Sequence, residues 1–434
     1  MARSYSCRSR MRGKSEESSV VRCQFQSRSR SRSQETHMQN TGIGRITTAQ
    51  FSDSYPPIMD GVAKVVVEYK KHLTDILGPV HIVVPSIPGQ DEYNEQDLTH
   101  NYPTIPIPKR SPYRFGMPWI LPGFSRKIAR LPLQLVHVHS PWMAGPLGWQ
   151  VSVLRQIPIV STFHTKYLDD ISRFFYGMHL PVEIARRIII DHYNRMDQVW
   201  VPNASTELTL REYGFRGPIE IIGHGTDIVK PANPEQSIKQ AEEFLGIDAE
   251  VPLLVYLGQL KLEKNLLFVL NSLRELKDSG HNFRFAFIGE GYARPELEKA
   301  AQDLGLPEVS FPGLVRDRTL LTSLLNRSKA LVFPSRYDTA GLVIKEAASL
   351  EVPSIVLRDS NAAEGIEDEV NGFLSDENPV SFGNKLRYML DNEDTRCVVG
   401  RKAYETLCRS WADVAREVAE RYRDLIKVKA HRSA

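Results

Sequence analysis

The chain has 434 residues, a length that suggests two or three domains of ordinary size. Hydrophobic residues make up 41% and charged residues 25%, so there is enough apolar material for folded cores. No apolar run reaches the roughly 18–20 residues that a membrane-spanning helix needs. The four cysteines form no CxxC pair or Cys/His cluster, which excludes a zinc finger and a disulfide-stapled small domain.

The net charge of +3 is unevenly distributed along the chain. Residues 1–37 hold nine Lys and Arg against three Glu, a net charge of +6, so the remaining residues together carry −3. A mildly acidic body lacks the basic footprint of a nucleic-acid-binding protein. We therefore expect no nucleic-acid partner.

Residues 1–42 form an Arg/Ser-rich tail that is poor in apolar residues, and we predict it to be disordered. Three explanations are open for this composition. It is typical of an organelle transit peptide, it is typical of a basic arm for RNA or anionic lipid, and it is compatible with upstream sequence of no role before a working protein that starts near Met38.

Short apolar strands alternate with helical stretches from about Ile43 onward, which predicts a parallel sheet covered by helices on both faces. The helical stretch GVAKVVVEYKKHLTDIL lies among the first of these strands. We assign residues 43–225 to this first domain. Its predicted strands are RITTAQF, VHIVVPS, LQLVHVHSP, IPIVSTFHT and DQVWVPN.

A second series of strands and helices predicts a second doubly wound domain over residues 226–408. Turn residues cluster near Gly223–Pro231 and mark the boundary. The predicted strands are VPLLVYLGQL, FRFAFIGEG, VSFPGL, KALVFPS and PSIVLRDS.

Residues 409–434 predict a C-terminal helix. Apolar residues recur there at helical spacing, and we interpret this stripe as core packing, with the first domain as one candidate surface. The stripe consists of Trp411, Val414, Val418, Tyr422 and Ile426.

In open parallel sheets, ligands bind beyond the carboxyl ends of the strands. The stretch VFPSRYDTAGLVIKEAASLEVPSIV places Asp338 after such a strand, and Glu346 follows about two turns later on a helix. A carboxylate at this position suits the two hydroxyls of a ribose, and Gly341 lets a ligand approach the backbone closely. Taken alone, Asp338 would be interpreted as a helix cap.

This stretch resembles the signature of the family 4 glycosyltransferases, in which an acidic residue is followed by seven residues and a Glu. The resemblance extends over nearly the whole chain after residue 43. It implies a GT-B fold, in which two facing Rossmann-like doubly wound α/β domains flank an interdomain cleft. The further matching segments are FSDSYPPIMDGVAKVV, STFHTKY, YLGQLKLEKN, IGEGYARPELEKAA and AAEGIEDEVNGFL.

The resemblance implies catalytic roles for four residues. Lys264 would neutralise the diphosphate and Glu346 would hold the ribose hydroxyls. His164 would lie near the transferred sugar. Asp338 matches the first acid of the signature, which is normally Glu, and the shorter side chain puts its contact with the sugar in question.

The diphosphate loop departs from the family pattern at Gln259, where the family usually has Arg. A neutral amide replaces a charged bidentate donor, so the leaving charge would be less well compensated. We consider Lys261 and Arg336 as candidates for the missing cation. The resemblance also implies that main-chain amides and side chains of several loops bind the donor, namely Gly61, Glu290, Gly341, Asn361 and Ala362.

The implied reaction is transfer of a hexose from a nucleotide-diphosphate sugar to an acceptor hydroxyl with retention at the anomeric carbon. No side chain is an obvious covalent nucleophile, so we expect front-face attack. Catalysis would rest on positioning and electrostatic stabilisation. We expect no metal and no cofactor, because no DxD pair stands where a metal would be needed.

Basic and aromatic residues interleave in PKRSPYRFGMPWILPGFSRK and ISRFFYGMHLPVEIARRIIIDHYNR, and such a pattern suits adsorption to anionic membranes. We expect a membrane lipid as acceptor, because this half resembles diacylglycerol and phosphatidylinositol glycosyltransferases. The alternative that the aromatics are core and the cations solvated stays open. The candidate surface residues are Arg110, Arg114, Phe174, Arg186 and Arg187.

Other functions were weighed against this one. The acceptor could be a polysaccharide or a soluble small molecule, and Gln259 and Asp338 would also suit a catalytically weakened scaffold of the same fold. A dinucleotide oxidoreductase would need GxGxxG after the first strand, and FSDSYPPIMDG does not supply it. We expect a cytoplasmic location, with peripheral membrane attachment, organelle targeting and the oligomeric state left open.

Overall fold

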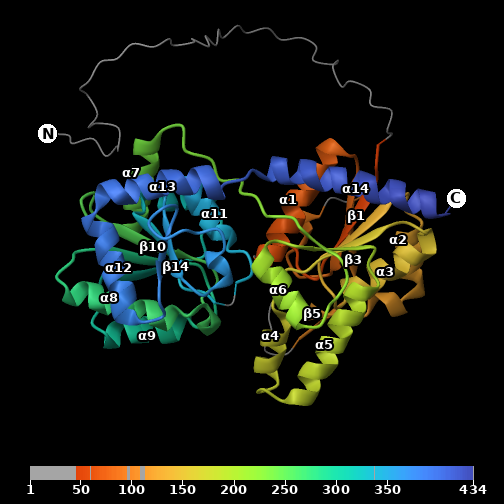
Figure 1. The fold of residues 1–434 in the computed structure, drawn as a ribbon, viewed down its shortest axis with the longest axis horizontal. Helices are drawn as coiled ribbons and strands as arrows, with labels where there is room; N and C mark the ends of the chain where they lie inside the picture. The colour runs from red at the N-terminus through yellow and green to blue at the C-terminus, as the bar shows by residue number, and fades with distance from the viewer. Residues whose placement is uncertain (1–44, 59, 95–97, 108–112, 337, 434) are drawn as a thin grey trace, which may run out of the picture. The chain divides into compact units, whose positions relative to one another are not determined.

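The computed structural model describes residues 45–58, 60–94, 98–107, 113–336 and 338–433. The tail predicted over residues 1–42 lies outside these residues, and so does Arg110. Within the described residues, the chain forms two parallel β-sheets, each flanked by helices (Figure 1). This architecture confirms the predicted pair of Rossmann-like α/β units.

The first sheet has the strand order β3-β2-β1-β6-β7-β8-β9, with all neighbours parallel. Phe51 of β1 pairs with Val83 on one side and with Val138 on the other, so the carboxyl ends of these strands lie side by side. The strands are β1 (Thr48–Phe51), β2 (Val80–Pro85), β3 (Thr99–Tyr102), β6 (Leu135–Val138), β7 (Ile159–Thr162), β8 (Gln198–Val201) and β9 (Ile219–Ile221).

Helices cover both faces of this sheet, because right-handed crossovers to opposite sides of β1 place their helices on opposite faces. One buried cluster joins α1 and α14 to one face, and two further clusters join the helices from α2 to α6 to the other. The helices are α1 (Gly61–Ile76), α2 (Pro122–Ala129), α3 (Ala144–Arg155), α4 (Tyr167–Phe174), α5 (His179–Asn194), α6 (Ala204–Glu212) and α14 (Trp411–Ser433), with the short η1 (Asp91–Tyr93) and η2 (Pro118–Ile120) and the antiparallel hairpin β4 (Ile105–Pro106) and β5 (Arg114–Phe115).

The second sheet has the order β12-β11-β10-β13-β14-β15, again with parallel neighbours. Its strands are β10 (Leu253–Leu257), β11 (Arg284–Ile288), β12 (Val309–Gly313), β13 (Ala330–Phe333), β14 (Ser354–Leu357) and β15 (Phe373–Ser375). The helices are α7 (Pro234–Leu245), α8 (Leu266–Asp278), α9 (Arg294–Asp303), α10 (Arg318–Arg327), α11 (Leu342–Ala348), α12 (Pro379–Asp391) and α13 (Glu393–Leu407), with the short η3 (Leu262–Lys264) and η4 (Asn361–Ala363).

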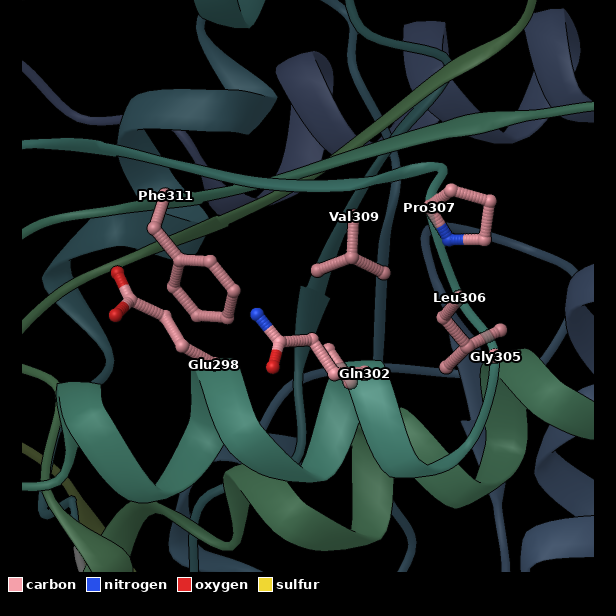
Figure 2. A pocket seen from close by; sticks show the side chains of 8 residues that line it. Glu298, Gln302, Gly305, Leu306, Pro307, Val309 and Phe311 are labelled. Carbon is pink, nitrogen blue, oxygen red and sulfur yellow. The ribbon is translucent and has the colours of Figure 1, made fainter.

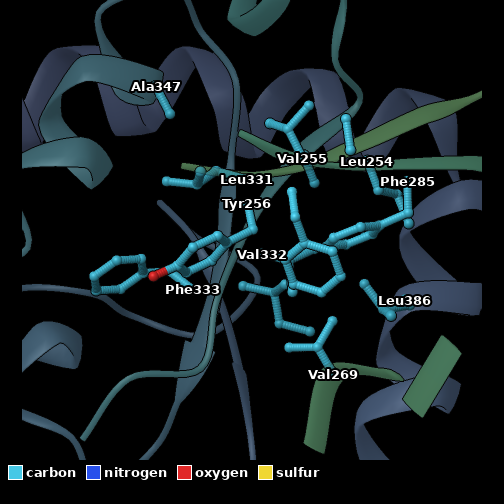
Figure 3. Close-up of a cluster of buried hydrophobic side chains, with 14 of the residues drawn as sticks. Leu254, Val255, Tyr256, Val269, Phe285, Leu331, Val332, Phe333, Ala347 and Leu386 are labelled. Carbon is cyan, nitrogen blue, oxygen red and sulfur yellow. The ribbon is translucent and has the colours of Figure 1, made fainter. Parts of the chain in front are cut away.

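The core of the second sheet is built from aliphatic and aromatic side chains of the central strands (Figure 3). Val255 and Leu331 come from paired strands, and Val269 and Leu386 reach the core from helices α8 and α12. Strands buried on both faces must be apolar along their whole length, which is why these runs were visible in the sequence.

Strands β3, β9 and β15 were not predicted. Each lies at an edge of its sheet and is only three or four residues long. An edge strand with one hydrogen-bonded neighbour does not need a continuous apolar run, so the pattern that reveals central strands is weak there.

Helix α14 packs along α1 on the first sheet (Figure 1). The predicted stripe is core, because Trp411, Val414, Val418 and Tyr422 are all buried in one cluster with Tyr69 of α1. Across the described residues, no helix combines the length and the apolar character that crossing a bilayer requires.

Candidate functional site

Each sheet has one point where the strand order changes direction, and ligands of open α/β sheets bind beyond the strand ends at such points. In the first sheet this point lies between β1 and β6, and in the second between β10 and β13. The loops after β10 and β13 carry the predicted residues Lys264 and Asp338. The topology therefore brings together two residues that are 74 positions apart.

Lys264 and Asp338 form an ion pair. Lys264 Nζ lies 2.5 Å from Asp338 Oδ1, and the lysine side chain is only 10% exposed. The second carboxylate oxygen, Asp338 Oδ2, is buried and has no hydrogen-bond partner among the described residues. Because burying an unpaired carboxylate oxygen costs free energy, this atom is suited to accept a hydrogen bond from a ligand.

Glu346 lies on α11 and is buried. Its Oε1 accepts a hydrogen bond of 2.9 Å from Arg318 Nη2, which also donates to Asp227 Oδ1 at 2.7 Å. Asp227 is in turn paired with Lys64 of α1, with Nζ 2.9 Å from Oδ1. Glu346 belongs to a local sequence pattern, whereas no local motif links Arg318, Asp227 and Lys64 to it, so these three residues were not predicted.

Gly341 precedes α11 in the left-handed conformation with φ of +51°. A Cβ at this position would lie 2.8 Å from Ile344 Cδ1 and close to Ala362, so the turn depends on glycine. Ala362 is buried, and the neighbouring Asn361 Nδ2 is a buried donor with no partner among the described residues. Asn361 is therefore a second polar side chain in this region that is able to bind a ligand.

The start of α1 lies close to the same loops. Asp60 caps the helix by accepting from Ala63 N, and a Cβ on Gly61 would lie 3.6 Å from Leu342 Cδ1. Asp60 Oδ2 also accepts from the Tyr113 hydroxyl at 3.0 Å. The predicted helix N-terminus at Gly61 is thus formed, and N-terminal amides of this kind bind anions.

Gln259, which stands where the resemblance expects Arg, hydrogen bonds with the Tyr113 hydroxyl. The Asp60 carboxylate, together with burial, holds the pKa of Tyr113 well above its ordinary value. The Gln259 carbonyl accepts from Tyr256 OH at 3.0 Å. Gln259 is therefore built into a network of neutral donors and one carboxylate.

The two candidates for the missing cation differ in their surroundings. Arg336 Nε is paired with Glu377 at 2.9 Å, and its side chain is 52% exposed. Burial, together with the nearby Lys264 ammonium, lowers the pKa of Lys261. The structure thus places the charge of Lys261 near Lys264 and engages Arg336 with another carboxylate.

Glu290 follows β11 and pairs with Arg294 of α9, whose Nη1 lies 2.5 Å from Glu290 Oε1. Its side chain is 48% exposed. The backbone carbonyl of Glu290 accepts from Leu260 N at 2.9 Å and fastens the loop after β10. The prediction that Glu290 binds the donor is not tested by these contacts.

His164 follows β7 and is buried. Burial lowers the pKa of His164 to about 3, so the ring is neutral at physiological pH. Its carbonyl accepts from the Thr339 hydroxyl at 2.6 Å, and Thr339 is the residue after Asp338. This hydrogen bond joins the loop of His164 to the loop of the Lys264–Asp338 pair.

Other buried imidazoles surround His164. Its ring stacks on His139 with centroids 5.2 Å apart and on His224 with centroids 5.7 Å apart. His139 stacks in turn on His137. These residues were not predicted, although the spacing of His137 and His139 in LVHVHS places both on one face of strand β6 and its extension.

The predicted acceptor surface lies partly on the α4–α5 hairpin (Figure 1). Phe174 is 51% exposed, Tyr176 96% and Leu180 69%, so this end of the hairpin presents large apolar side chains to solvent. Arg187 is exposed and donates to Glu183 Oε1 at 3.1 Å. Arg186 donates to both Glu183 oxygens and to Tyr213 O. The alternative that these aromatic residues are core is wrong for Phe174 and Tyr176.

An apolar hollow of about 530 Å³ lies beside this hairpin. Its lining residues are Trp142, Ile171, Phe175, Leu180, Pro181, Ile184, Ala185 and Ile188. Arg114, another predicted surface residue, donates to Thr104 Oγ1 at 2.8 Å and to Thr104 O, which fastens the β4–β5 hairpin.

Another hollow, of about 340 Å³, lies between α9 and the edge strand β12 (Figure 2). Glu298 and Gln302 of α9 face Phe311 and Val309 across it. None of the predicted site residues lines this hollow. In the described part of the chain, no three His, Cys, Asp or Glu side chains gather in a way that could hold a metal ion.

Comparisons with known proteins identify the family models and relatives that this chain matches. Residues 59–230 match the family model described as Glycosyltransferase Family 4, and residues 237–406 match the model described as Glycosyl transferases group 1. An alpha-monoglucosyldiacylglycerol synthase of Acholeplasma laidlawii is 24% identical over 337 residues, which are 76% of this chain and 84% of that protein. A D-inositol 3-phosphate glycosyltransferase of Corynebacterium kroppenstedtii is 26% identical over 316 residues, 70% of this chain and 69% of that protein.

Among solved structures, Anabaena HepE in complex with UDP and glucose superposes with a TM-score of 0.71 at 17% identity. The match covers 88% of this chain and all of the other. These likenesses confirm the predicted GT-B fold.

Proposed function

We propose that this chain, which belongs to glycosyltransferase family 4, transfers a hexose from a nucleotide-diphosphate sugar to a hydroxyl of a membrane lipid with retention at the anomeric carbon. One observation carries the donor side of the proposal. The Lys264–Asp338 pair lies at the switch point of the second sheet and has a buried carboxylate oxygen without a hydrogen-bond partner among the described residues.

In the proposed reaction, the bond between the anomeric carbon and the diphosphate oxygen breaks, and a bond to the acceptor oxygen forms on the same face. The acceptor proton passes to the departing phosphate. Lys264 and the amides at the start of α1 stabilise the negative charge that grows on the diphosphate. Asp338 Oδ2 accepts from a sugar hydroxyl, and Glu346 accepts from the ribose.

Three observations support a lipid acceptor. Apolar side chains at the end of the α4–α5 hairpin are exposed, and α5 also carries the exposed Arg187, which is paired with Glu183. Exposed apolar patches on a helix with basic residues suit adsorption to an anionic membrane. The Acholeplasma relative is named for the synthesis of an alpha-monoglucosyldiacylglycerol, which is a glycolipid. The hollow beside the hairpin has apolar walls that suit an acyl chain.

A screen of nucleotide sugars against lipid extracts, with product mass as the readout, tests the reaction. We expect one hexose to be added to a lipid by the wild-type protein and not by Glu346→Ala. Anomeric configuration of the product, read by NMR, tests retention. If no donor is consumed with any acceptor class, the scaffold alternative replaces the proposal.

Membrane adsorption is tested separately by sedimentation with vesicles. Phe174→Ser combined with Leu180→Ser is expected to weaken binding to anionic vesicles. Val153→Ser with Leu154→Ser is the matched control, because these side chains are also exposed but lie on α3. Equal loss of binding in both double variants would contradict a docking role for the hairpin.

A further inference from the structure

His137 and His139, two buried imidazoles of the first sheet, belong to one continuous chain of hydrogen bonds that ends at His164. His139 Nδ1 lies 2.9 Å from His164 Nε2, and His139 Nε2 lies 2.7 Å from Gln50 Oε1. The Gln50 amide nitrogen donates to the Tyr422 hydroxyl at 3.2 Å. This series of hydrogen bonds therefore reaches from the candidate site to helix α14.

The series of hydrogen bonds continues beyond Tyr422. The Tyr422 oxygen lies 2.5 Å from His137 Nδ1, and His137 Nε2 lies 2.7 Å from Thr162 Oγ1. Gln50, His137, His139 and Tyr422 are all fully buried. No solvent is needed to complete these hydrogen bonds.

The positions of the protons follow from donor and acceptor chemistry. A neutral imidazole has one nitrogen that donates and one that accepts. Burial, together with the neighbouring imidazoles, holds the pKa values of His137 and His139 well below their ordinary value, so both rings are neutral. Gln50 Oε1 only accepts, so His139 carries its proton on Nε2 and accepts at Nδ1.

The same reasoning extends in both directions. Since His139 Nδ1 accepts, His164 must donate through Nε2, and its Nδ1 is then an unprotonated lone pair. At the other end, the Gln50 amide donates to the Tyr422 hydroxyl, whose oxygen also lies within hydrogen-bond distance of His137 Nδ1. Among the described residues, His164 Nδ1 has no hydrogen-bond partner.

We propose that Tyr422 is a positioning residue for His164. Through Gln50 and His139 it fixes the tautomer of His164, so that the Nδ1 lone pair accepts a hydrogen bond from a hydroxyl of the transferred sugar. The proposal rests on the proposed function for the identity of the ligand. The tautomer of His164 is a property of the folded protein alone, so this part of the proposal is independent of the proposed function.

The test is the ¹⁵N NMR spectrum of the full-length protein labelled at histidine, recorded without donor, with His164→Gln used to assign the His164 signals. We expect one tautomer of His164 in the wild type, protonated at Nε2. Tyr422→Phe frees the Gln50 amide to rotate, and Gln50→Leu removes the acceptor for His139. Both variants are expected to populate the two tautomers of His164.

Tyr69→Phe is the matched control, because the Tyr69 ring also packs against His137 and His139 but its hydroxyl is not part of the chain. This variant is expected to keep the single tautomer. If Tyr422→Phe does not fold, Gln50→Leu still decides the outcome. A wild-type His164 protonated at Nδ1, or one unchanged tautomer in both variants, would overturn the proposal.

Kinetics provide a second readout. Loss of one oriented hydrogen bond to the sugar is expected to lower kcat by roughly tenfold in Tyr422→Phe, whereas KM for the donor changes by less than about twofold. If the tautomer populations change as expected but no sugar is transferred, the proposed function is wrong and the positioning role of Tyr422 is supported. If sugar is transferred but wild-type His164 is protonated at Nδ1, only the positioning role of Tyr422 is wrong.

Discussion

The two sheets end in different kinds of polar chemistry. Beyond the second sheet, charged groups meet in pairs, with Lys264 on Asp338 and Arg318 on Glu346. Beyond the first sheet, neutral imidazoles are linked through amide and hydroxyl groups. Paired charges suit a departing diphosphate, and neutral hydrogen bonds suit the orientation of a sugar.

The largest effect on kcat is expected from Lys264, which supplies the ammonium group beyond the second sheet. Lys264→Met should lower kcat by roughly 10²–10³-fold, as the loss of an electrostatic stabiliser does elsewhere. The measurement is the initial rate of donor consumption at saturating substrates.

Lys277→Met is the control for Lys264→Met, because Lys277 is also ion-paired in the second domain but with Glu308 of another loop. The comparison between the two sheets would break down if both lysine variants lost the same activity.

The next largest effect is expected from Glu346→Gln. This variant weakens the ribose contact and leaves Arg318 with Asp227 alone, so KM for the donor should rise by roughly 10–100-fold, in the range of hydrogen bonds to charged groups. Glu298→Gln, which alters an Arg pair on α9, should leave KM unchanged. A fall in kcat with constant KM would place Glu346 in the chemical step instead.

Acid should act on another buried imidazole next to the first sheet, that of His192 on α5. Burial, with a contribution from the nearby Arg195, lowers the pKa of His192 to about 3, whereas the unfolded side chain titrates near 6.5. Below about pH 6.5 the unfolded state binds a proton that the folded state excludes. Stability from this residue is therefore intact above pH 6.5 and is lost progressively toward pH 3.

His192→Gln keeps a partner for the Ser161 hydroxyl, which lies 3.0 Å from His192 Nε2. We expect the free energy of unfolding to fall with acid less steeply in this variant, by about 1.4 kcal/mol per pH unit at most. Urea unfolding between pH 7 and 4 measures the slope. Parallel curves for the two proteins would mean that His192 is protonated in the folded state.

The smallest effect on kcat is expected from Lys261 and Arg336, the two candidates for the positive charge that Gln259 lacks. Lys261→Met should lower kcat by roughly fivefold to tenfold, because its charge lies near Lys264. Arg336→Met should leave kcat nearly unchanged, since that guanidinium is paired with Glu377. The reverse ranking of the two variants would assign the missing charge to Arg336.

The sequence predicted the central strands because a strand buried on both faces must be apolar throughout. It also predicted Lys264, Asp338 and Glu346, because the family signature and the loop after β10 are local patterns. The edge strands β3, β9 and β15 were missed, since short edge strands lack that apolar run.

What the sequence determined by itself were the features carried by neighbouring residues: apolar strands, helical stripes, and acids at fixed spacing. Only the tertiary structure decided which distant groups meet. Gln50 and Tyr422 are 372 positions apart, and Arg318 reaches Glu346 from another helix. Strand order and helix packing decide which groups become partners. Each buried polar group needs its partner, because leaving it unpaired in the interior costs free energy.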